Sequence, residues 1–293
     1  MPTDSQLDGC IVTTCKGRLE FLRQTLPLMI ATGLPVTVVD FDCPDGTADY
    51  VGQNHPAVNV VHLKNQPIFS LSIARNEGAR HSKGALIAFI DSDVMLTEGF
   101  GAFVRARERS EDEFFTGDLG NSLAGQCLVP RGRFDEIGGY DEAIVGWGFE
   151  DYDLYSRLTA KGARQELFPS GLMSSIPHAE SLRLRFTGEN KNRWVSHRIN
   201  SVYSHIKRDI EGASRPLTLK ERRDLRQMVE RVIGRLRASG SGALAFSLPL
   251  KELSLAVTPD VLASDTKAKE GAYHLDCSLT YTLSLGKGAA RRS

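Results

Sequence analysis

The segment ALIAFIDSD, residues 85–93, indicates the fold class of this 293-residue chain. It is a short apolar run that ends in two aspartates, Asp91 and Asp93, separated by one serine. The run suits a strand buried on both faces and is too short for a typical helix, which predicts a parallel sheet covered by helices. Both carboxylates would then leave the carboxyl edge of the sheet, where open α/β sheets bind their ligands.

Carboxylates at that edge suit a divalent cation, Mg²⁺ or Mn²⁺, whose remaining positions phosphate oxygens can fill. A nucleotide diphosphate with its metal would be the ligand. The alternative is a solvated acidic turn, because a bare D-x-D motif has a high false-positive rate. No glycine-rich phosphate loop competes with the metal hypothesis: TTCKGRLE, after the first predicted strand, has one glycine, and no G-x-x-x-x-G-K-[ST] occurs.

Strands and helices alternate before this segment. A helix is expected from about Arg18, with a kink at Pro27, and a second over residues 72–83 with Ser72 as its N-cap. The β-α-β alternation predicts a mostly parallel sheet. The β-branched segments expected as strands are residues 10–15, 35–40 and 58–63.

The amino-acid composition argues against several classes of protein. Lysine plus arginine and aspartate plus glutamate number 36 each, so no global charge points to nucleic acid. The five cysteines are odd in number and lack C-x-x-C spacing, which favours reduced core thiols over a disulfide framework. The first nine residues have no basic and apolar leader pattern, and no 18-residue apolar run exists. A cytoplasmic protein is expected.

Two segments, VVDFDCPDGT (38–47) and ARNEGARHSKGALIAFIDSD (74–93), resemble the nucleotide-sugar half of family-2-type glycosyltransferases. The resemblance implies the GT-A fold, with a uridine contact at Asp40 and a metal contact at Asp93. Phe41 replaces the family's second acidic residue, which leaves the choice between Asp40 and Asp42 open, and a turn-forming role for Asp40 is the alternative. The donor-binding residues that it implies are Thr13, Asp40, Asp42, Arg75, Asn76, Asp91 and Ser92.

The segment GGYDEAIVGWGFEDYDLYSRLTAKG, residues 138–162, predicts a helix that starts with acidic residues and ends near Gly162. Carboxylates in a first turn are favoured by the helix dipole, which is the simplest explanation of the pattern. Glycines beside Trp147 also let a backbone approach a ligand, and an indole suits a sugar face. The segment resembles the carboxyl-terminal galactosyltransferase signature GWG-x-ED-x-D.

That second resemblance implies acceptor contacts by Trp147, Gly148 and Glu150, with Asp151 as the general base. The helix N-terminus is expected to keep Asp151 ionised while weakening its basicity. The resemblance further implies that His178, in SSIPHAESLRLRF, is a metal ligand with Asp93, although a lone histidine is more often structural. The other histidines match no motif.

Three regions are expected along the chain. Residues 1–185 form a GT-A catalytic domain, with a nucleotide-sugar half (1–95) and an acceptor half (96–185). Residues 186–240 form a basic helical segment, and residues 241–293 an appendage that includes strands. The basic stretch 183–237 either packs on the catalytic domain or docks on anionic lipid at the inner face of the membrane, or on a polyanionic acceptor.

The resemblances imply an inverting, metal-dependent glycosyltransferase of polysaccharide biosynthesis. It would move a hexose or N-acetylhexosamine, with galactose favoured, from a UDP-sugar to a glycan or glycoconjugate hydroxyl, with Mn²⁺ or Mg²⁺ as cofactor. One alternative is a non-catalytic nucleotide-sugar or carbohydrate-binding module on the same scaffold. A sugar-nucleotide pyrophosphorylase is a third, but CIVTTCKGRLEF lacks its glycine-rich nucleotide loop.

Overall fold

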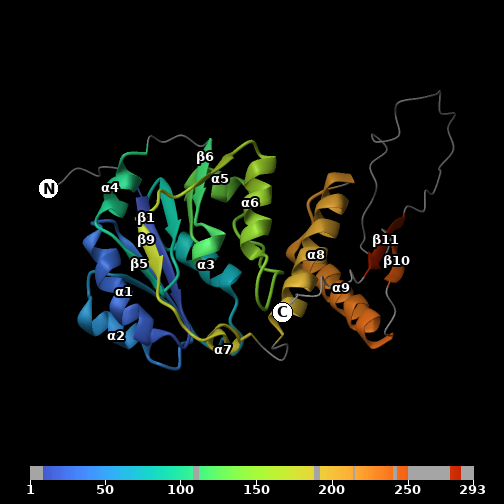
Figure 1. Cartoon of the computed structure of the whole chain (residues 1–293), viewed down its shortest axis with the longest axis horizontal. Helices are drawn as coiled ribbons and strands as arrows, with labels where there is room; N and C mark the ends of the chain where they lie inside the picture. The colour runs from blue at the N-terminus through green and yellow to red at the C-terminus, as the bar shows by residue number, and fades with distance from the viewer. Residues whose placement is uncertain are drawn as a thin grey trace, which may run out of the picture. The chain divides into compact units, whose positions relative to one another are not determined.

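A computed structural model describes residues 9–107, 112–187, 192–213, 215–239, 243–249 and 278–284. The chain divides into two compact units, Met1–His197 and Arg198–Ser293 (Figure 1). The boundary expected after residue 185 falls inside the first unit, because that unit includes the first turn of helix α8 (Arg193–Ala213).

The first unit is built on a seven-stranded sheet in the order β3-β2-β1-β4-β7-β6-β8. β1 pairs in parallel with β2 and β4, and β2 with β3, as the alternation predicts. β7 runs antiparallel to β4 and β6. The strand bounds are β1 Gly9–Cys15, β2 Val36–Phe41, β3 Asn59–Leu63, β4 Leu86–Phe89, β6 Glu113–Thr116, β7 Cys127–Pro130 and β8 Arg164–Leu167.

Helices cover both faces of this sheet, so β1, β2 and β4 are fully buried as their continuous apolar runs predict. Successive residues of β1 alternate between two cores: Ile11 packs with α1 and α4, and Val12 with α3 and α6. Pro27 lies inside α1. The helices are α1 Leu19–Ala31, α2 Thr47–Asn54, α3 Leu71–Arg80, α4 Gly99–Arg105, η1 Leu119–Asn121, α5 Arg131–Glu136, α6 Glu150–Ala160 and α7 Glu180–Leu184.

The predicted helix over residues 72–83 is α3, but its N-cap is Ser70 rather than Ser72. The Ser70 hydroxyl accepts from the Ile73 amide at 3.3 Å, and Ser72 is buried within the first turn. The two residues share the composition of a capping motif, and only the packing of the helix decides between them.

The chain leaves β1 toward β2 and β3, and returns to β4 on the other side of β1. This reversal is a switch point of the kind at which open α/β sheets bind ligands. The carboxyl ends of β1, β2 and β4, called the carboxyl edge below, therefore form the expected binding region (Figure 1).

The second unit contains most of α8, together with α9 (Leu219–Ser239) and an antiparallel pair, β10 (Ala243–Pro249) and β11 (Ser278–Ser284). Within it the Arg226 Nε donates to Asn200 Oδ1 at 3.0 Å, which joins α9 to α8. Strands were expected in both segments. Most of the C-terminal appendage, including Cys277 and the final GKGAARRS, lies outside the described residues.

Helix α3 can pack against the sheet because residue 78 has no side chain. A Cβ at Gly78 would collide with Val12 of β1 and Val39 of β2. Gly78→Ala is therefore expected to lower the free energy of unfolding by about 1–3 kcal/mol, the usual cost of overpacking a core.

Urea denaturation measures this change. The matched control is Gly52→Ala in α2, where a Cβ meets nothing within 4 Å, and which is expected to stabilise by up to about 1 kcal/mol through helix propensity. Equal effects of the two substitutions would contradict this account of the α3 interface.

Candidate active site

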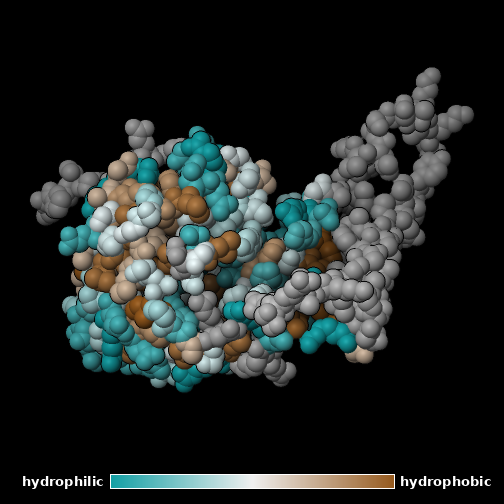
Figure 2. Space-filling model, in the orientation of Figure 1, coloured by the Kyte–Doolittle hydropathy of each residue, from teal (hydrophilic) through white to brown (hydrophobic). Residues whose placement is uncertain are grey.

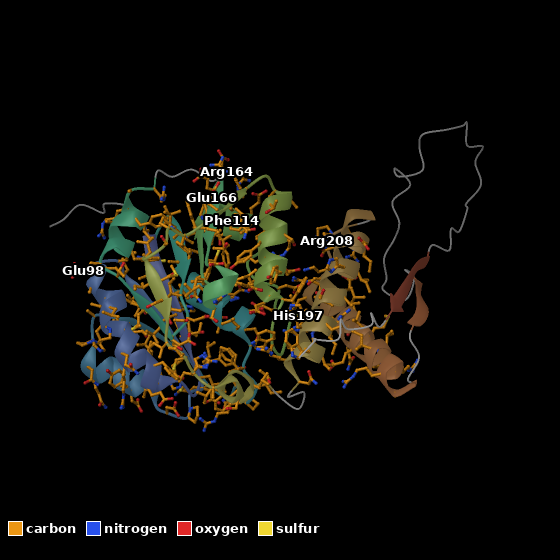
Figure 3. All side chains as sticks on the ribbon, viewed as in Figure 1. Glu98, Phe114, Arg164, Glu166, His197 and Arg208 are labelled. Carbon is orange, nitrogen blue, oxygen red and sulfur yellow. The ribbon has the colours of Figure 1, made fainter. Side chains whose placement is uncertain are left out.

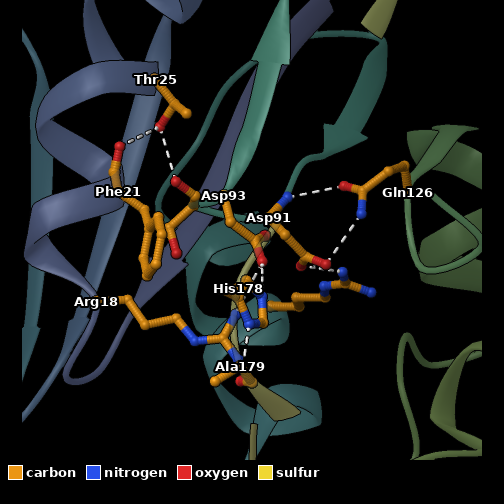
Figure 4. Close-up of polar contacts among 10 residues, drawn as sticks. Arg18, Phe21, Thr25, Asp91, Asp93, Gln126, His178 and Ala179 are labelled. Atoms are coloured by element: carbon orange, nitrogen blue, oxygen red, sulfur yellow. Dashed lines mark hydrogen bonds and ion pairs between the residues drawn. The ribbon is translucent and has the colours of Figure 1, made fainter. Parts of the chain in front are cut away.

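Asp93 and His178 meet at the carboxyl edge (Figure 4). His178 Nε2 lies 2.6 Å from Asp93 Oδ2, and the same oxygen accepts from Arg18 Nη1 at 3.2 Å. A two-stranded antiparallel pairing explains the contact: β5 (Val94–Leu96) starts directly after Asp93 and runs antiparallel to β9 (Met173–Ser175). The Ile176 amide then donates to the Asp93 carbonyl at 2.8 Å, so the chain passes Asp93 just before it reaches His178.

Asp91 is held by two groups. Gln126 forms two hydrogen bonds with it: Gln126 Nε2 donates to Asp91 Oδ2 at 2.9 Å, and Gln126 Oε1 accepts from the Asp91 amide at 2.8 Å (Figure 4). Arg75 Nη2 donates to Asp91 Oδ1 at 2.8 Å. Burial opposes the charge on Asp91, but Arg75 and Gln126 outweigh it and lower the pKa of Asp91. Asp91 is thus a fixed, ionised carboxylate.

Arg75 is fully buried on α3 and joins three parts of the site. Its Nη1 donates to the Tyr140 hydroxyl at 2.9 Å, in addition to the Asp91 ion pair. Burial by itself would lower the pKa of Arg75, but Tyr140, Asp91 and more distant acids raise it. The guanidinium therefore stays charged.

Asn76, the next residue, fixes the segment that leads to the GWG loop (Gly146–Gly148). Its side chain donates to the Tyr140 carbonyl and accepts from the Tyr140 amide, both at 2.9 Å, and it also donates to Glu142 at 2.9 Å. The adjacent pair Arg75 and Asn76 thus holds both the side chain and the backbone of Tyr140.

Helix α6 brings two more acidic residues, Glu150 and Asp151, to the carboxyl edge. It begins at Glu150, and the residues before it take positive φ values: Gly146 (81°), Gly148 (87°) and Phe149 (77°). Glycine adopts such angles without strain, which accounts for the two glycines of the motif. The charges of Arg75 and Asp91 influence the pKa of both Glu150 and Asp151, so the N-terminus of α6 faces the carboxyl edge.

The two acids of α6 are weaker than ordinary carboxylic acids. Burial, followed by the charge of Asp151, raises the pKa of Glu150 to about 8. Burial likewise raises the pKa of Asp151, although the Tyr152 amide donates to its Oδ1 at 2.8 Å and favours the charged form. These backbone donors at the helix N-terminus lower the pKa of Asp151, as expected, but desolvation outweighs them and the net pKa is raised.

Trp147 is positioned by the first turn of α8, which belongs to the same unit. The Trp147 amide donates to Ser196 Oγ at 2.8 Å. The His197 ring (labelled in Figure 3) lies 6.1 Å from the Trp147 ring, and the Arg193 guanidinium lies 5.4 Å from it. A Cβ at Gly148 would lie 3.0 Å from His197, so the glycine allows this close packing.

Two family models match this part of the chain. Residues 10–115 match glycosyl transferase family 2, and residues 118–181 match the N-terminal domain of galactosyltransferase. Residues 10–181 are a GT-A glycosyltransferase domain. Both resemblances expected from the sequence are confirmed. No curated protein matches the chain in sequence.

Solved structures share the fold of the glycosyltransferase domain. A mannosyltransferase from Pyrobaculum calidifontis, solved with GDP-Man and Mn²⁺, is 15% identical with a TM-score of 0.51, and the match covers 82% of this chain and 80% of that chain. GalNAc-T7, solved with UDP, GalNAc and Mn²⁺, is 12% identical with a TM-score of 0.53, over 78% of this chain and 55% of that chain. The match thus spans about half of GalNAc-T7.

The predicted donor residues Asp40 and Asp42 lie at the end of β2. Asp40 is buried, and its carboxylate accepts from the Cys43 amide at 2.7 Å and the Ala48 amide at 2.6 Å, which is a turn-forming role. Asp42 is more exposed and accepts from the Gln66 amide at 3.0 Å. The uridine contact of either residue stays a prediction.

Two other predicted donor residues of the glycosyltransferase domain are buried. Thr13 is in the middle of β1 with 0% exposure, and Ser92 has 2% exposure. The Ser92 carbonyl accepts from the Thr25 hydroxyl at 2.8 Å, which ties the D-x-D segment to α1 (Figure 4). Of the predicted donor set, Arg75 and Asp91 are joined by an ion pair, and Asn76 is joined to Arg75 through Tyr140.

The described residues offer few side chains that could ligate a metal ion. Among the described residues no group of three His, Cys, Asp or Glu side chains could hold an ion. Asp93 and His178 nevertheless fit the expected metal: one carboxylate and one imidazole, already in contact, suit Mn²⁺, and a diphosphate can supply further oxygens.

Sequence reasoning missed Gln126, Tyr140 and Ser196. Each reaches its partner across 35 or more residues, as in the contact of Gln126 with Asp91 and of Ser196 with Trp147. The one available signal was the polar Gln126 directly before the apolar strand Cys127–Pro130. Its meaning depends on the pairing of that strand with β4.

The raised pKa of Glu150 predicts a pH dependence of stability. The protonated form stabilises the fold fully below the unfolded pKa of 4.5, and this contribution is lost as the pH rises through about 8. Relative to Glu150→Gln, the wild type should lose on the order of 1–3 kcal/mol of unfolding free energy between pH 5 and pH 9.

Urea denaturation at several pH values measures this difference. Glu98→Gln, at an exposed position (labelled in Figure 3), is the control and should follow the wild type. Parallel pH profiles of the wild type and Glu150→Gln would contradict the buried protonated state.

Proposed function

We propose that this chain is an inverting, metal-dependent glycosyltransferase that moves a hexose or N-acetylhexosamine from a UDP-sugar to a sugar hydroxyl. The observation that carries the proposal is the meeting of the Asp93–His178 pair, the Arg75–Asp91 ion pair and the α6 acids around one sheet edge. The GDP-Man, UDP and GalNAc of the two similar structures support a nucleotide-sugar donor.

Asp93 and His178 would hold the metal, and Mn²⁺ is favoured over Mg²⁺ because one ligand is an imidazole. The Mn²⁺ in both similar structures supports this choice. When bound, the ion supplies charge neutralisation to the departing diphosphate. Arg18, whose guanidinium already contacts Asp93, adds positive charge on the same side.

Arg75, Asn76 and Asp91 would orient the sugar-bearing end of the donor. Their hydrogen bonds to Tyr140 and Gln126 keep them rigid, which reduces the cost of ordering the site at each turnover. Of Asp40, within β2, and Asp42, directly after it, Asp42 is the better candidate for the nucleoside contact, because it is partly exposed.

The proton of the acceptor would go to Asp151. The acceptor oxygen forms a bond to the anomeric carbon, the bond from that carbon to the diphosphate breaks, and the hydroxyl proton moves to the Asp151 carboxylate. A raised pKa makes Asp151 a stronger base than an exposed aspartate. Glu150, protonated at neutral pH, can donate a hydrogen bond to the acceptor, and Trp147 can contact the sugar ring.

A contact with anionic membranes through the basic helical region is part of the same proposal. Four arginines of α9 are exposed: Arg223, Arg231, Arg235 and Arg237. Figure 2 shows hydrophilic and hydrophobic residues together on the visible face of this unit. Of the described helices, none has the length and hydropathy needed to cross a bilayer.

A binding module without catalysis is the second candidate. It would use the same donor residues, and it is disfavoured by the two half-buried acids with raised pKa values at the N-terminus of α6, which binding alone does not need. Turnover separates the two candidates.

Asp151→Asn is expected to lower the rate of UDP release from the preferred donor by about 10²- to 10⁴-fold, because it removes the proton acceptor. Affinity for UDP should change little. The measurement is UDP release from a panel of UDP-sugars with Mn²⁺, Mg²⁺ or EDTA. Asp135→Asn, at an exposed position on α5, is the matched control. Unchanged turnover in Asp151→Asn would contradict the base assignment.

Asp93→Asn and His178→Ala are each expected to weaken Mn²⁺-dependent UDP binding at least about tenfold, equivalent to ~1.4 kcal/mol. Isothermal titration with Mn²⁺ and with EDTA measures the effect. His81→Ala, at an exposed histidine after α3, should bind as the wild type does. UDP affinity that is the same with and without metal would contradict this site.

A further inference from the structure

Two free cysteines are neighbours at the carboxyl edge, where the segment after β1 and the start of α2 hold their sulfurs. Cys15 is the last residue of β1 and is buried, whereas Cys43 lies in the turn after β2 and is partly exposed. Each cysteine is the largest influence on the pKa of the other, which Cys43 raises for Cys15 and Cys15 lowers for Cys43. The Gly17 amide donates to Cys43 Sγ at 3.1 Å, and the Thr47 hydroxyl to Cys15 Sγ at 3.2 Å.

The two sulfurs differ in character. Three kinds of donor surround Cys43: the Cys15 thiol, the Thr47 hydroxyl and backbone amides, and they lower its pKa to about 6. The same contact and burial raise the pKa of Cys15. A partly exposed thiolate beside a buried protonated thiol is the arrangement in which one cysteine reacts and the other resolves the product.

The other described cysteines lack this arrangement. Cys10 and Cys127 are fully buried, and the pKa of each is raised, mainly by burial. Among the described cysteines, the combination of a partly exposed thiol with a lowered pKa and a neighbouring thiol is therefore specific to Cys43 and Cys15.

Cys43 lies in the turn that follows β2, next to the predicted donor residues Asp40 and Asp42. Asp40 holds the Cys43 amide, and the Lys16 ammonium donates to the carbonyls of Phe41 and Asp42 at 3.0 and 2.9 Å. Asp45, in the same turn, accepts from the Leu19 amide at 3.3 Å, next to Arg18. Movement of Cys43 would therefore reach both the Asp42 turn and the start of α1.

We propose that Cys43 and Cys15 form a peroxide-reactive thiol pair whose oxidation to a disulfide closes the donor side of the carboxyl edge. The Cys43 thiolate attacks a peroxide, its O–O bond breaks, and, with one proton, sulfenic acid and an alcohol or water form. The Cys15 thiol then displaces water from that sulfenic acid as the S–S bond forms. Both thiols lose one electron each, and the peroxide takes up both.

The disulfide has a structural consequence. An S–S bond of about 2 Å is much shorter than a hydrogen-bonded sulfur contact, so the turn must move toward β1. The Gly17 and Thr47 hydrogen bonds to sulfur depend on the present geometry. The effect on ligand binding rests on the proposed function, whereas the thiol reaction does not.

The first test treats the full chain with one equivalent of hydrogen peroxide and maps disulfides by mass spectrometry. A Cys15–Cys43 disulfide, loss of two titratable thiols and reversal by dithiothreitol are expected. Cys15→Ser should instead leave a sulfenic acid at Cys43 that dimedone traps, and Cys43→Ser should react much more slowly. Cys277→Ala, at a position outside the described residues, is the control and should form the same disulfide.

The second test titrates UDP with Mn²⁺ into the reduced and oxidised chains. Oxidation should weaken UDP binding at least tenfold, with recovery after reduction. Absence of the Cys15–Cys43 disulfide, or equal affinity of the two forms, would overturn the proposal. If the reduced chain binds no UDP, the proposed function and this effect on binding both fail, while the disulfide map still decides whether the pair reacts.

Discussion

The ion pair between Arg75 and Asp91 is the interaction on which the site depends. A guanidinium that is fully buried costs several kcal/mol in lost hydration unless it is paired and hydrogen-bonded. Here Asp91 and the Tyr140 hydroxyl supply those partners. Because Arg75 comes from α3, Asp91 follows β4 and Tyr140 precedes α6, this one cation fixes three parts of the chain relative to each other.

The positive charge of Arg75 also lowers the free-energy cost of placing Glu150 and Asp151 next to each other. Two carboxyl groups next to each other in sequence, both desolvated, repel each other and would be costly without a nearby positive charge. The field of Arg75 lowers the pKa of both acids while burial raises them, with burial prevailing. A proton is therefore retained on Glu150 at neutral pH, and the difference between the two neighbours is what assigns them separate roles in the proposed reaction.

Local sequence patterns predicted much of this structure. The apolar run before Asp91 is a buried strand, the glycines beside Trp147 have positive φ, and the acidic start of α6 is where the pattern puts it. Such features depend on a few neighbouring residues and on backbone geometry. The GT-A fold followed from resemblance, since strand order between β4, β7 and β6 is not readable from any single segment.

What the sequence did not predict depends on distant contacts. Gln126 is an unremarkable polar residue until β7 pairs with β4 and brings it to Asp91. The N-cap of α3 lies two residues before the predicted one, and the net rise in the pKa of Asp151 comes from burial, which cannot be read from the first turn of a helix. The contact between Cys15 and Cys43 likewise depends on the β1–β2 register.

Hydrogen–deuterium exchange of the full chain, with and without UDP and Mn²⁺, tests most directly whether this edge is the ligand site. Protection is expected in residues 40–48, 72–78 and 89–94, and, once an acceptor sugar is added, in residues 146–152. Protection confined to residues 198–239, or none at saturating UDP and Mn²⁺, would contradict the account.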